Sequence, residues 1–362
     1  MSKNKTRAKI VVGLGYGDEG KGITVSHLID ESKKPIVIRY SGGQQSGHTV
    51  HIGDIKHICS NFGAGVLKGI STYFTEHTTF YPVTIAREME VLARKGYKKP
   101  VLVLHPMAKM TTPWDVWVNR SCNENLDDGT CGLGIGATMH RNIVDNQGLH
   151  AIDLLHMFIF KEKVRMIEKS CFTHYNKPSW FDKEVKEFWN AVNTIEWAVS
   201  NYNFLLEYET LIFEGSQGVL LDKDHGIFPN VTYANTTSKN AMEVCDILNI
   251  KKRHVYGVIR AYHTRHGAGY FYEDEIELKE TEHEINVNNE YQGEFRIARL
   301  DYGLVDYAAA IETLYSLGYK QTLMVTCCNQ VYEEDEFEAS MLGSEWFNIK
   351  LSHSPYGEFK NY

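Results

Sequence analysis

The segment KIVVGLGYGDEGKG, residues 9–22, decides the fold of this chain. Its first part is apolar and β-branched, which predicts a buried strand over residues 9–14, and a helix-like stretch, residues 23–30, follows. Gly15 and Lys21 then have the spacing of a phosphate-binding loop at a strand-to-helix turn, where backbone N–H groups and the helix N-terminus favour an anion. A plain glycine-rich turn would explain the glycines, but not the charged side chains among them.

This loop departs from the standard pattern in one place. A standard phosphate-binding loop continues after its lysine with Ser or Thr, which binds Mg²⁺, but Gly22 stands there. Asp18, inside the loop, offers a carboxylate that could hold the metal instead. The missing hydroxyl also weakens the alternative of an ordinary P-loop ATPase or kinase.

Strands and helices alternate along the rest of the sequence. Further short apolar runs bounded by Gly, Pro or charge predict buried parallel strands, and helical patterns lie between them. This order predicts an α/β fold with a doubly wound, mainly parallel central sheet, a P-loop-like nucleotide site and helical insertions. No linker or repeat divides the chain, so residues 1–362 are expected to form a single domain. The predicted strands are residues 35–39, 101–104, 210–213, 255–259 and 322–326, and the clearest predicted helices are residues 83–96 and 182–202.

Composition narrows the class of protein. The net charge of −8 argues against binding duplex nucleic acid, which needs dense Lys and Arg. The seven cysteines are scattered without a Cys-x-x-Cys pair, which is typical of a reducing compartment. The polar, basic N-terminus lacks the apolar core of a signal peptide, and no apolar stretch approaches membrane-spanning length. We therefore expect a cytoplasmic protein with no membrane partner.

A second polar loop, RYSGGQQSGHTV at residues 39–50, also follows a predicted strand. Its glycines, amides and hydroxyls suit a loop that lies against a polar ligand. A single histidine is usually a structural group, but His48 sits between Gly and Thr, a setting suited to acid–base work near neutral pH.

Together these loops resemble the adenylosuccinate synthetase family, whose pattern is Gly-Asp-Glu-Gly-Lys-Gly-Lys followed by Arg-x-x-Gly-Gly-x-Asn-Ala-Gly-His-Thr. The resemblance continues in order along nearly the whole chain. The further matching segments are GTCGLGIG (129–136), FEGSQG (213–218), LDKDHG (221–226), VT (231–232), NTT (235–237) and AYHTRHGAG (261–269).

The resemblance implies a two-step ligase reaction with Mg²⁺ as cofactor. The γ-phosphate of a nucleoside triphosphate moves to O6 of a 6-oxopurine nucleotide, and the aspartate amine then displaces that phosphate at C6. Asp18 would take the N1 proton and bind Mg²⁺, with the backbone oxygen of Gly47 as a further ligand. His48 would hydrogen-bond O6 and the transferring group, and Lys21 would balance phosphate charge.

The remaining site residues are carried over from the matching motifs. Those expected at the nucleoside triphosphate are Gly17, Glu19, Gly20, Gly22, Gly47, Thr49, Asn329, Ser352 and Pro355. Those expected at the acceptor nucleotide or aspartate are Gln45, Ser46, Thr130, Cys131, Gln217, Thr232, His266, Arg296 and Arg299.

Some assignments stay open at this point. Arg296 is favoured over Arg299 as the clamp for the aspartate carboxylates. Glu214, Asp222, His225 and Asn235 are either functional or supporting structure. The family is dimeric, so a homodimer is expected, and Arg141 is the nearest candidate for an arginine that reaches across it.

Departures from the family pattern bear on the choice of nucleotides. Members that use GTP carry a late segment whose Asp reads guanine, whereas LMVTCCN (323–329) lacks it, which favours ATP or dATP. With the altered acceptor loop at residues 44–46, the chain looks most like the phage 2-aminoadenylosuccinate synthetase branch, which takes dGMP. The alternatives are an ordinary adenylosuccinate synthetase acting on IMP and a non-catalytic nucleotide-binding protein.

Overall fold

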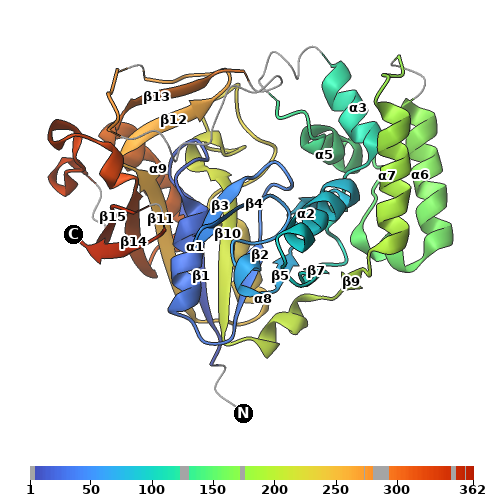
Figure 1. Cartoon of the computed structure of the whole chain (residues 1–362), viewed down its shortest axis with the longest axis horizontal. Helices are drawn as coiled ribbons and strands as arrows, with labels where there is room; N and C mark the ends of the chain where they lie inside the picture. The colour runs from blue at the N-terminus through green and yellow to red at the C-terminus, as the bar shows by residue number, and fades with distance from the viewer. Residues whose placement is uncertain are drawn as a thin grey trace.

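A ten-stranded, mostly parallel sheet is the centre of the computed structural model, which describes residues 5–122, 130–171, 176–272, 274–279, 293–343, 348–354 and 356–362 (Figure 1). The strand order is β16-β15-β14-β11-β1-β10-β2-β5-β7-β9, and only the pair β15–β16 is antiparallel. The bounds are β1 (Arg7–Gly13), β2 (Pro35–Arg39), β5 (Thr72–Phe74), β7 (Leu102–Leu104), β9 (Ala198–Val199), β10 (Thr210–Gly218), β11 (Lys252–Arg260), β14 (Lys320–Thr326), β15 (Ile349–Ser352) and β16 (Phe359–Asn361).

Three small pairs of strands accompany the sheet. Two are antiparallel and one is parallel, and β3 with β4 forms a hairpin that contacts the first helix. These strands are β3 (His48–Ile52) with β4 (Ile55–Cys59), β6 (Thr79–Phe80) with β8 (Lys109–Met110), and β12 (Tyr262–His266) with β13 (Phe295–Arg299).

Helices cover both faces of the sheet, as the alternation of side chains in β1 requires. Ile10 and Val12 enter one apolar core, which also contains residues of α8 and α9. Val11, between them, enters the core on the other face, which contains residues of α1 and α2. The predicted doubly wound arrangement is thereby confirmed. The helices are α1 (Lys21–Asp30), α2 (Pro82–Arg94), α3 (Pro113–Ser121), α5 (Ile135–Ile143), α6 (Met157–Cys171), α7 (Phe181–Thr194), α8 (Lys239–Ile247) and α9 (Tyr302–Ser316).

The helices are not spread evenly over the sheet. α2, α3, α5, α6 and α7 gather at one end of the molecule, while the β12–β13 hairpin, β14 and β15 lie at the other (Figure 1). The helical insertions expected from the sequence therefore form a helical side region beyond β7.

All six predicted strands occur, but one predicted helix is wrong. A helix over residues 182–202 was expected, whereas α7 ends at Thr194 and is followed by β9, which pairs with β7 and forms the edge of the sheet. Trp197 lies in the break and its indole N–H donates to the Val192 carbonyl at 3.1 Å. Pairing with the sheet edge outweighs the helical pattern of the sequence here.

Two expectations concern the chain as a whole. Within the described residues, no helix is both long enough and apolar enough to span a bilayer. That residues 1–362 form one domain stays a prediction.

Truncation of a core side chain in β1 tests the importance of the central strand. Ile10 is completely buried, so Ile10→Ala should lower the free energy of unfolding by about 2–5 kcal/mol, from lost burial and the cavity left behind. Chemical denaturation measures this change. Val101→Ala is the control, because Val101 is 53% exposed, and its effect should be small. Equal effects of the two changes would contradict the assigned core.

Candidate active site

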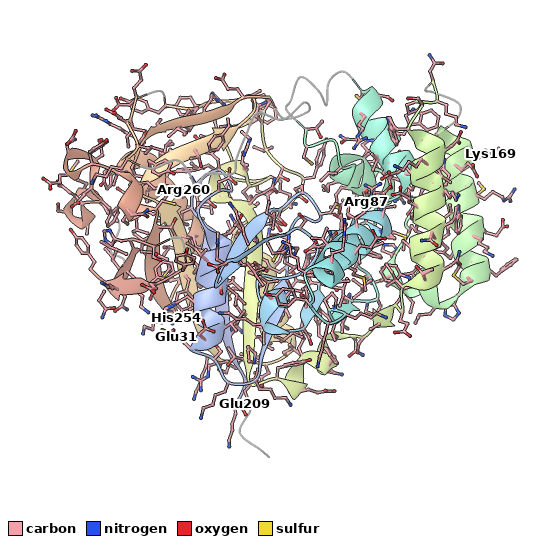
Figure 2. The ribbon with its side chains drawn as sticks, viewed as in Figure 1. Glu31, Arg87, Lys169, Glu209, His254 and Arg260 are labelled. Atoms are coloured by element: carbon pink, nitrogen blue, oxygen red, sulfur yellow. The ribbon has the colours of Figure 1, made fainter. Side chains whose placement is uncertain are left out.

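The polar loops predicted from the sequence meet at one edge of the sheet. β1, β2, β10, β11 and β14 are parallel neighbours, so the loops that follow their carboxyl ends lie side by side. Figure 2 shows His254 near the start of β11 and Arg260 at its far end, which marks this edge. The candidate site is built there.

The glycine-rich loop between β1 and α1 is held together by its own glutamate. Glu19 Oε1 accepts the backbone N–H groups of Gly15 at 3.0 Å and of Gly17 at 2.6 Å. Glu19 Oε2 lies 2.6 Å from Lys21 Nζ, which also donates to the Gly17 carbonyl at 2.6 Å. Both charged side chains are buried, at 4% and 1% exposure. The carboxylate thus neutralises Lys21 and accepts two of the loop N–H groups that the sequence pattern offered to phosphate. The predicted nucleotide contacts of this loop stay predictions.

Gly22, the residue that breaks the standard phosphate-loop pattern, lies at a close approach of two elements. A Cβ atom on Gly22 would be 2.9 Å from both His48 Cβ and the Thr49 carbonyl oxygen. The first turn of α1 therefore packs against the start of β3 with no room for a side chain. The glycine is explained by this packing.

His48 is held by a buried carboxylate. Its Nδ1 lies 2.7 Å from Glu214 Oε1, and the same carboxylate accepts the backbone N–H of Ala64 at 3.2 Å. Burial lowers the pKa of His48 and outweighs the attraction of Glu214. Burial raises the pKa of Glu214, but His48 and Arg39 outweigh it and the net pKa is lowered. A neutral imidazole thus donates from Nδ1 to an ionised carboxylate, and its buried Nε2 has no partner among the described residues.

Arg39 is a second buried charge that the sequence did not single out. Its guanidinium is completely buried and donates to the Gly43 carbonyl at 3.2 Å, to Ser216 Oγ at 3.1 Å and to Ser46 Oγ. It therefore joins the loop after β2 to the end of β10 and offsets the charge of Glu214. Ser46 is buried against this guanidinium, and its contact with substrate stays a prediction. The signal available in the sequence was an arginine and a glutamate at the ends of two predicted strands.

Asp18 lies on the open side of the loop. Its Oδ2 is 3.2 Å from His266 Nε2, and Arg260 Nε donates to its backbone carbonyl. Burial raises the pKa of Asp18, but His266 and Arg260 outweigh it, so the pKa lies below its ordinary value. The side chain is 25% exposed. An ionised, accessible carboxylate is the ligand that Mg²⁺ prefers, so Asp18 fits the predicted metal role. Gly47, the other predicted ligand, is exposed.

Gln45 and Gln217 bring the acceptor loop to the phosphate loop. Gln45 Nε2 donates to Gln217 Oε1 at 3.4 Å, and a Cβ on Gly17 would be 3.8 Å from Gln217 Cα. Gln45 Oε1 is buried and has no hydrogen-bond partner among the described residues. Both predicted substrate residues thus lie next to the loop that carries Asp18. Thr49 is half-buried on β3, beside Gly22.

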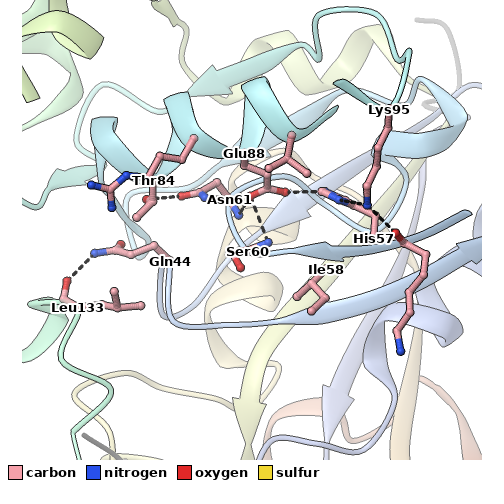
Figure 3. Close-up of a pocket in the computed structure, with 12 residues that line it drawn as sticks. Gln44, His57, Ile58, Ser60, Asn61, Thr84, Glu88, Lys95 and Leu133 are labelled. Atoms are coloured by element: carbon pink, nitrogen blue, oxygen red, sulfur yellow. Dashed lines mark hydrogen bonds and ion pairs between the residues drawn. The ribbon is translucent and has the colours of Figure 1, made fainter. Parts of the chain in front are cut away.

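Gln44 points the other way, towards a cavity of about 560 Å³ between β4 and α2 (Figure 3). Its Nε2 donates to the Leu133 carbonyl at 3.0 Å and to Thr111 Oγ1 at 3.1 Å. These bonds tie the acceptor loop to the segment that carries Thr130. Thr130 Oγ1 lies 3.0 Å from Asn119 Nδ2, ahead of the α5 N-terminus, and burial raises the pKa of the neighbouring Cys131.

Thr232 lies in a loop anchored by Asp222. The Asp222 carboxylate is fully buried and accepts backbone N–H groups of Asp224 at 2.8 Å, His225 at 3.2 Å and Thr236 at 2.5 Å. Thr232 N donates to the Leu221 carbonyl at 2.8 Å. Asp222 is therefore supporting structure.

The other two open residues of this block are engaged in the same way. His225 bonds Tyr315 Oη at 2.7 Å, and Asn235 Nδ2 bonds Asp224 Oδ2 at 2.8 Å. Of the four residues left open, only Glu214 touches a predicted catalytic group.

The two candidate arginines for aspartate lie apart on β13. Arg296 Nη2 donates to the carbonyls of Gly267 and, at 3.1 Å, Gly269, next to His266. Arg299 pairs with Asp335 at 3.0 Å. Arg296 thus contacts the turn that follows His266, whereas Arg299 is engaged by Asp335, and which of them binds aspartate stays a prediction.

The end of β14 is joined to the glycine-rich loop. Thr326 Oγ1 donates to the Glu19 carbonyl at 2.8 Å. Asn329 is half-buried in the turn that follows β14, and Ser352 is buried at the end of β15, which pairs with β14. Pro355, predicted at the nucleotide base, lies outside the described residues.

Arg141 does not fit the role suggested for it. It is buried and pairs with both carboxylate oxygens of Asp115, at 2.7 Å and 2.9 Å, while also donating to the carbonyls of Met110 and Gln147. Asp115 in turn caps α3. Because the guanidinium is engaged inside its own chain, Arg141 is not an arginine that reaches across a dimer.

The fold and these loops define an α/β protein with a doubly wound sheet and a glycine-rich strand-to-helix loop at the carboxyl edge of that sheet. A sequence model described as adenylosuccinate synthetase matches residues 10–330, so the chain belongs to the adenylosuccinate synthetase family, whose members are ligases that form carbon–nitrogen bonds.

Individual relatives agree. The adenylosuccinate synthetase of Clostridium botulinum (strain Eklund 17B / Type B) is 30% identical over 335 residues, 86% of this chain and 76% of the relative. That of Borrelia turicatae is 28% identical over 278 residues, which are 72% of this chain but 63% of the relative. The match thus spans less than two thirds of the Borrelia protein.

Two solved structures share the fold. Fully ligated adenylosuccinate synthetase from Plasmodium falciparum superposes with a TM-score of 0.71 at 22% identity, covering 89% of this chain and 77% of the other. The cyanophage S-2L succinoaminodeoxyadenylate synthetase (PurZ), bound to dGMP and dATP, gives 0.61 at 15% identity, covering 90% and 85%.

Replacing the carboxylate behind His48 tests its function. Glu214→Gln keeps the size of the side chain but removes the charge that orients and stabilises the imidazole, so turnover should fall about a hundredfold or more. Steady-state kinetics and nucleotide affinity are the measurements, with affinity nearly kept. The matched control is Glu312→Gln. Glu312 is another buried glutamate; its carboxylate accepts the Ser238 N–H at 2.8 Å, and burial raises its pKa to about 7. Normal turnover of Glu214→Gln would contradict the assignment.

Restoring the standard phosphate-loop hydroxyl should be harmful here. Gly22→Ser places a side chain where His48 and Thr49 already stand, so we expect a loss of about 1–3 kcal/mol in unfolding free energy. Turnover should fall as well, because His48 must move. Thermal unfolding and kinetics would show both effects. A Gly22→Ser variant with unchanged stability and higher turnover would mean that α1 and β3 are not in contact.

Proposed function

We propose that this protein is a ligase that joins L-aspartate to C6 of a 6-oxopurine nucleotide, driven by a nucleoside triphosphate. The observation that supports it most is His48, whose Nδ1 is fixed by Glu214 and whose Nε2 is buried and unpaired within the described chain. A nitrogen held in this way suits a phosphoryl group that forms on O6.

Proton movements follow from the charges of the site. Asp18 is ionised and accepts the N1 proton, which makes O6 nucleophilic. His48 is neutral at rest, so Nε2 becomes a donor only after it gains a proton. The negative charge of a phosphoryl group beside Nε2 favours that proton, and Glu214 stabilises the resulting imidazolium. His48 can then assist the departure of phosphate when the aspartate amine attacks C6.

Mg²⁺ is the proposed cofactor. Asp18 and the backbone oxygen of Gly47 would hold it, and it would offset phosphate charge during transfer. Lys21 has a different proposed role, because Glu19 already neutralises it: Nζ holds the loop in shape and reaches phosphate only if the Glu19 pair opens.

For the acceptor nucleotide we propose dGMP, giving 2-amino-2′-deoxyadenylosuccinate. The unpaired Gln45 Oε1 supports this choice, because it offers a hydrogen-bond acceptor in a loop where the family pattern has Asn. Gln217, Thr232 and Thr130 would hold the rest of the nucleotide, and Arg296 the aspartate. IMP, used by an ordinary adenylosuccinate synthetase, is the alternative.

For the phosphoryl donor we propose ATP or dATP. Asn329 and Ser352 lie beside the end of β14, and no carboxylate of the segment 323–329 can pair with guanine N1 and N2. We also propose a cytoplasmic location and, from the family, a homodimer. The net charge gives no reason to propose a nucleic-acid partner.

Turnover assays that cross the nucleotides test the proposal. With aspartate and Mg²⁺ present, IMP or dGMP is combined with GTP, ATP or dATP, and product is measured. Turnover of dGMP with ATP or dATP is expected. Turnover of IMP with GTP alone would overturn the choice of nucleotides. No turnover in any combination would favour a nucleotide-binding protein without this reaction.

Asp18→Ala should abolish turnover while nucleotide still binds, since the variant removes the base but leaves the loop glycines. Nucleotide affinity by calorimetry and turnover by product formation separate the two effects. A variant with near-normal turnover would remove Asp18 from the mechanism.

A further inference from the structure

A second group of metal-binding side chains lies away from Asp18 and His48. Glu76 and His77 stand in the loop between β5 and β6, and Glu243 projects from α8. One ligand atom from each of these three residues lies within 4.8 Å of the other two. His105, in the loop after β7, is beside them, with Nδ1 3.1 Å from Glu76 Oε2.

The spacing of these atoms fits a small cation. His77 Nε2 is 3.7 Å from Glu76 Oε1 and 3.5 Å from Glu243 Oε2, too far for hydrogen bonds. Nitrogen and oxygen ligands at ordinary zinc distances lie about 3.4 Å from one another around a tetrahedral ion. Small side-chain movements would therefore place all three on one ion.

The polar atoms of this group are poorly satisfied by one another. His77 Nε2 is buried and has no hydrogen-bond partner in the described chain. His105 Nδ1, by contrast, accepts the Met107 N–H at 3.2 Å, so its single lone pair is already engaged. Lys109 donates to the backbone carbonyl of Glu76 at 2.8 Å. A divalent cation would satisfy the lone pair of His77 Nε2 and the negative charge of the two carboxylates together.

Another cluster, His57, Cys59 and Glu88, shows the contrast. Glu88 Oε2 accepts the backbone N–H of Asn61 at 2.7 Å, its Nδ2 at 2.8 Å and the Ser60 N–H at 3.2 Å, and Oε1 lies 3.2 Å from His57 Nε2 (Figure 3). Burial raises the pKa of Cys59, which keeps it a thiol. These ligands are already satisfied, so that cluster does not need a metal.

We propose that Glu76, His77 and Glu243 form a second metal site that takes Zn²⁺, with water in the fourth position. One imidazole nitrogen with two carboxylate oxygens suits Zn²⁺ better than Mg²⁺, which prefers oxygen ligands alone.

A metal at this site would stabilise the backbone of the acceptor loop, residues 39–50, through the segment that carries the ligands. In the same loop as the ligands, Thr75 N donates to the Arg39 carbonyl at 3.0 Å, and Thr79 N donates to the Gly42 carbonyl at 2.8 Å. A metal bound at Glu76 and His77 therefore fixes the backbone that holds the loop leading to His48.

Metal binding to the purified, chelator-treated chain tests the proposal, with Mg²⁺ in excess to fill the Asp18 site. We expect one equivalent of Zn²⁺ to bind, and Co²⁺ in its place to show the absorption of a tetrahedral nitrogen–oxygen site. His77→Ala should weaken Zn²⁺ at least about tenfold, and Glu243→Gln should weaken it as well. Zn²⁺ should raise the melting temperature of the wild type but not of His77→Ala.

The matched control is His140→Ala. His140 also faces a carboxylate, with Nδ1 3.4 Å from Asp145 Oδ2, but it belongs to no described cluster of three ligands. The affinity of the His140→Ala variant for Zn²⁺ should equal that of the wild type. Because Glu243 is half-exposed, Glu243→Gln keeps the test valid if His77→Ala does not fold. No saturable Zn²⁺ binding, binding unchanged in both variants, or a cobalt–thiolate band would overturn the proposal.

Discussion

The buried carboxylate of Glu214 is the group on which the site depends. It sits midway along β10, in the middle of the sheet, and accepts hydrogen bonds from His48 and from the Ala64 backbone. Such a charge is costly to bury unless it is paired and fully hydrogen-bonded, and Arg39 supplies the opposite charge. The segments that follow β2 and β4 therefore both contact the Glu214 carboxylate or its arginine partner. His48 receives its orientation from the same contact.

Much of the fold could be predicted from the sequence because its signals are local. Residues 35–39 form β2 with the expected bounds, since a short β-branched run bounded by proline and a polar loop is buried in the sheet centre. The β10 strand runs on to Gly218, past its apolar residues, because Glu214 and Ser216 find partners across the sheet. The helix expected over residues 182–202 stops at Thr194, where pairing with β7 competes. Contacts at a distance caused both differences.

The candidate site divides in the same way. Asp18 and His48 could be found from their motifs, because the neighbouring glycines mark loops at strand ends. Arg39 could not, since its role depends on Ser216, which lies 177 positions further along the chain. The position of Arg141 was also beyond reach, because its partner Asp115 is a helix cap 26 residues before it. Neither pairing leaves a trace in local spacing.

The close packing of Gly22 on His48 and Thr49 has a thermodynamic consequence. The first turn of α1 is in van der Waals contact with the start of β3 at Gly22, so the two elements cannot move independently. A ligand that shifts the β3–β4 hairpin must also shift the entrance of the helix behind the phosphate loop. By thermodynamic linkage, if one ligand changes the affinity for the other by some factor, the second ligand changes the affinity for the first by the same factor. The two proposed nucleotide sites would then be coupled without a domain movement, because Gly22 has no side chain and lets α1 and β3 pack directly on each other.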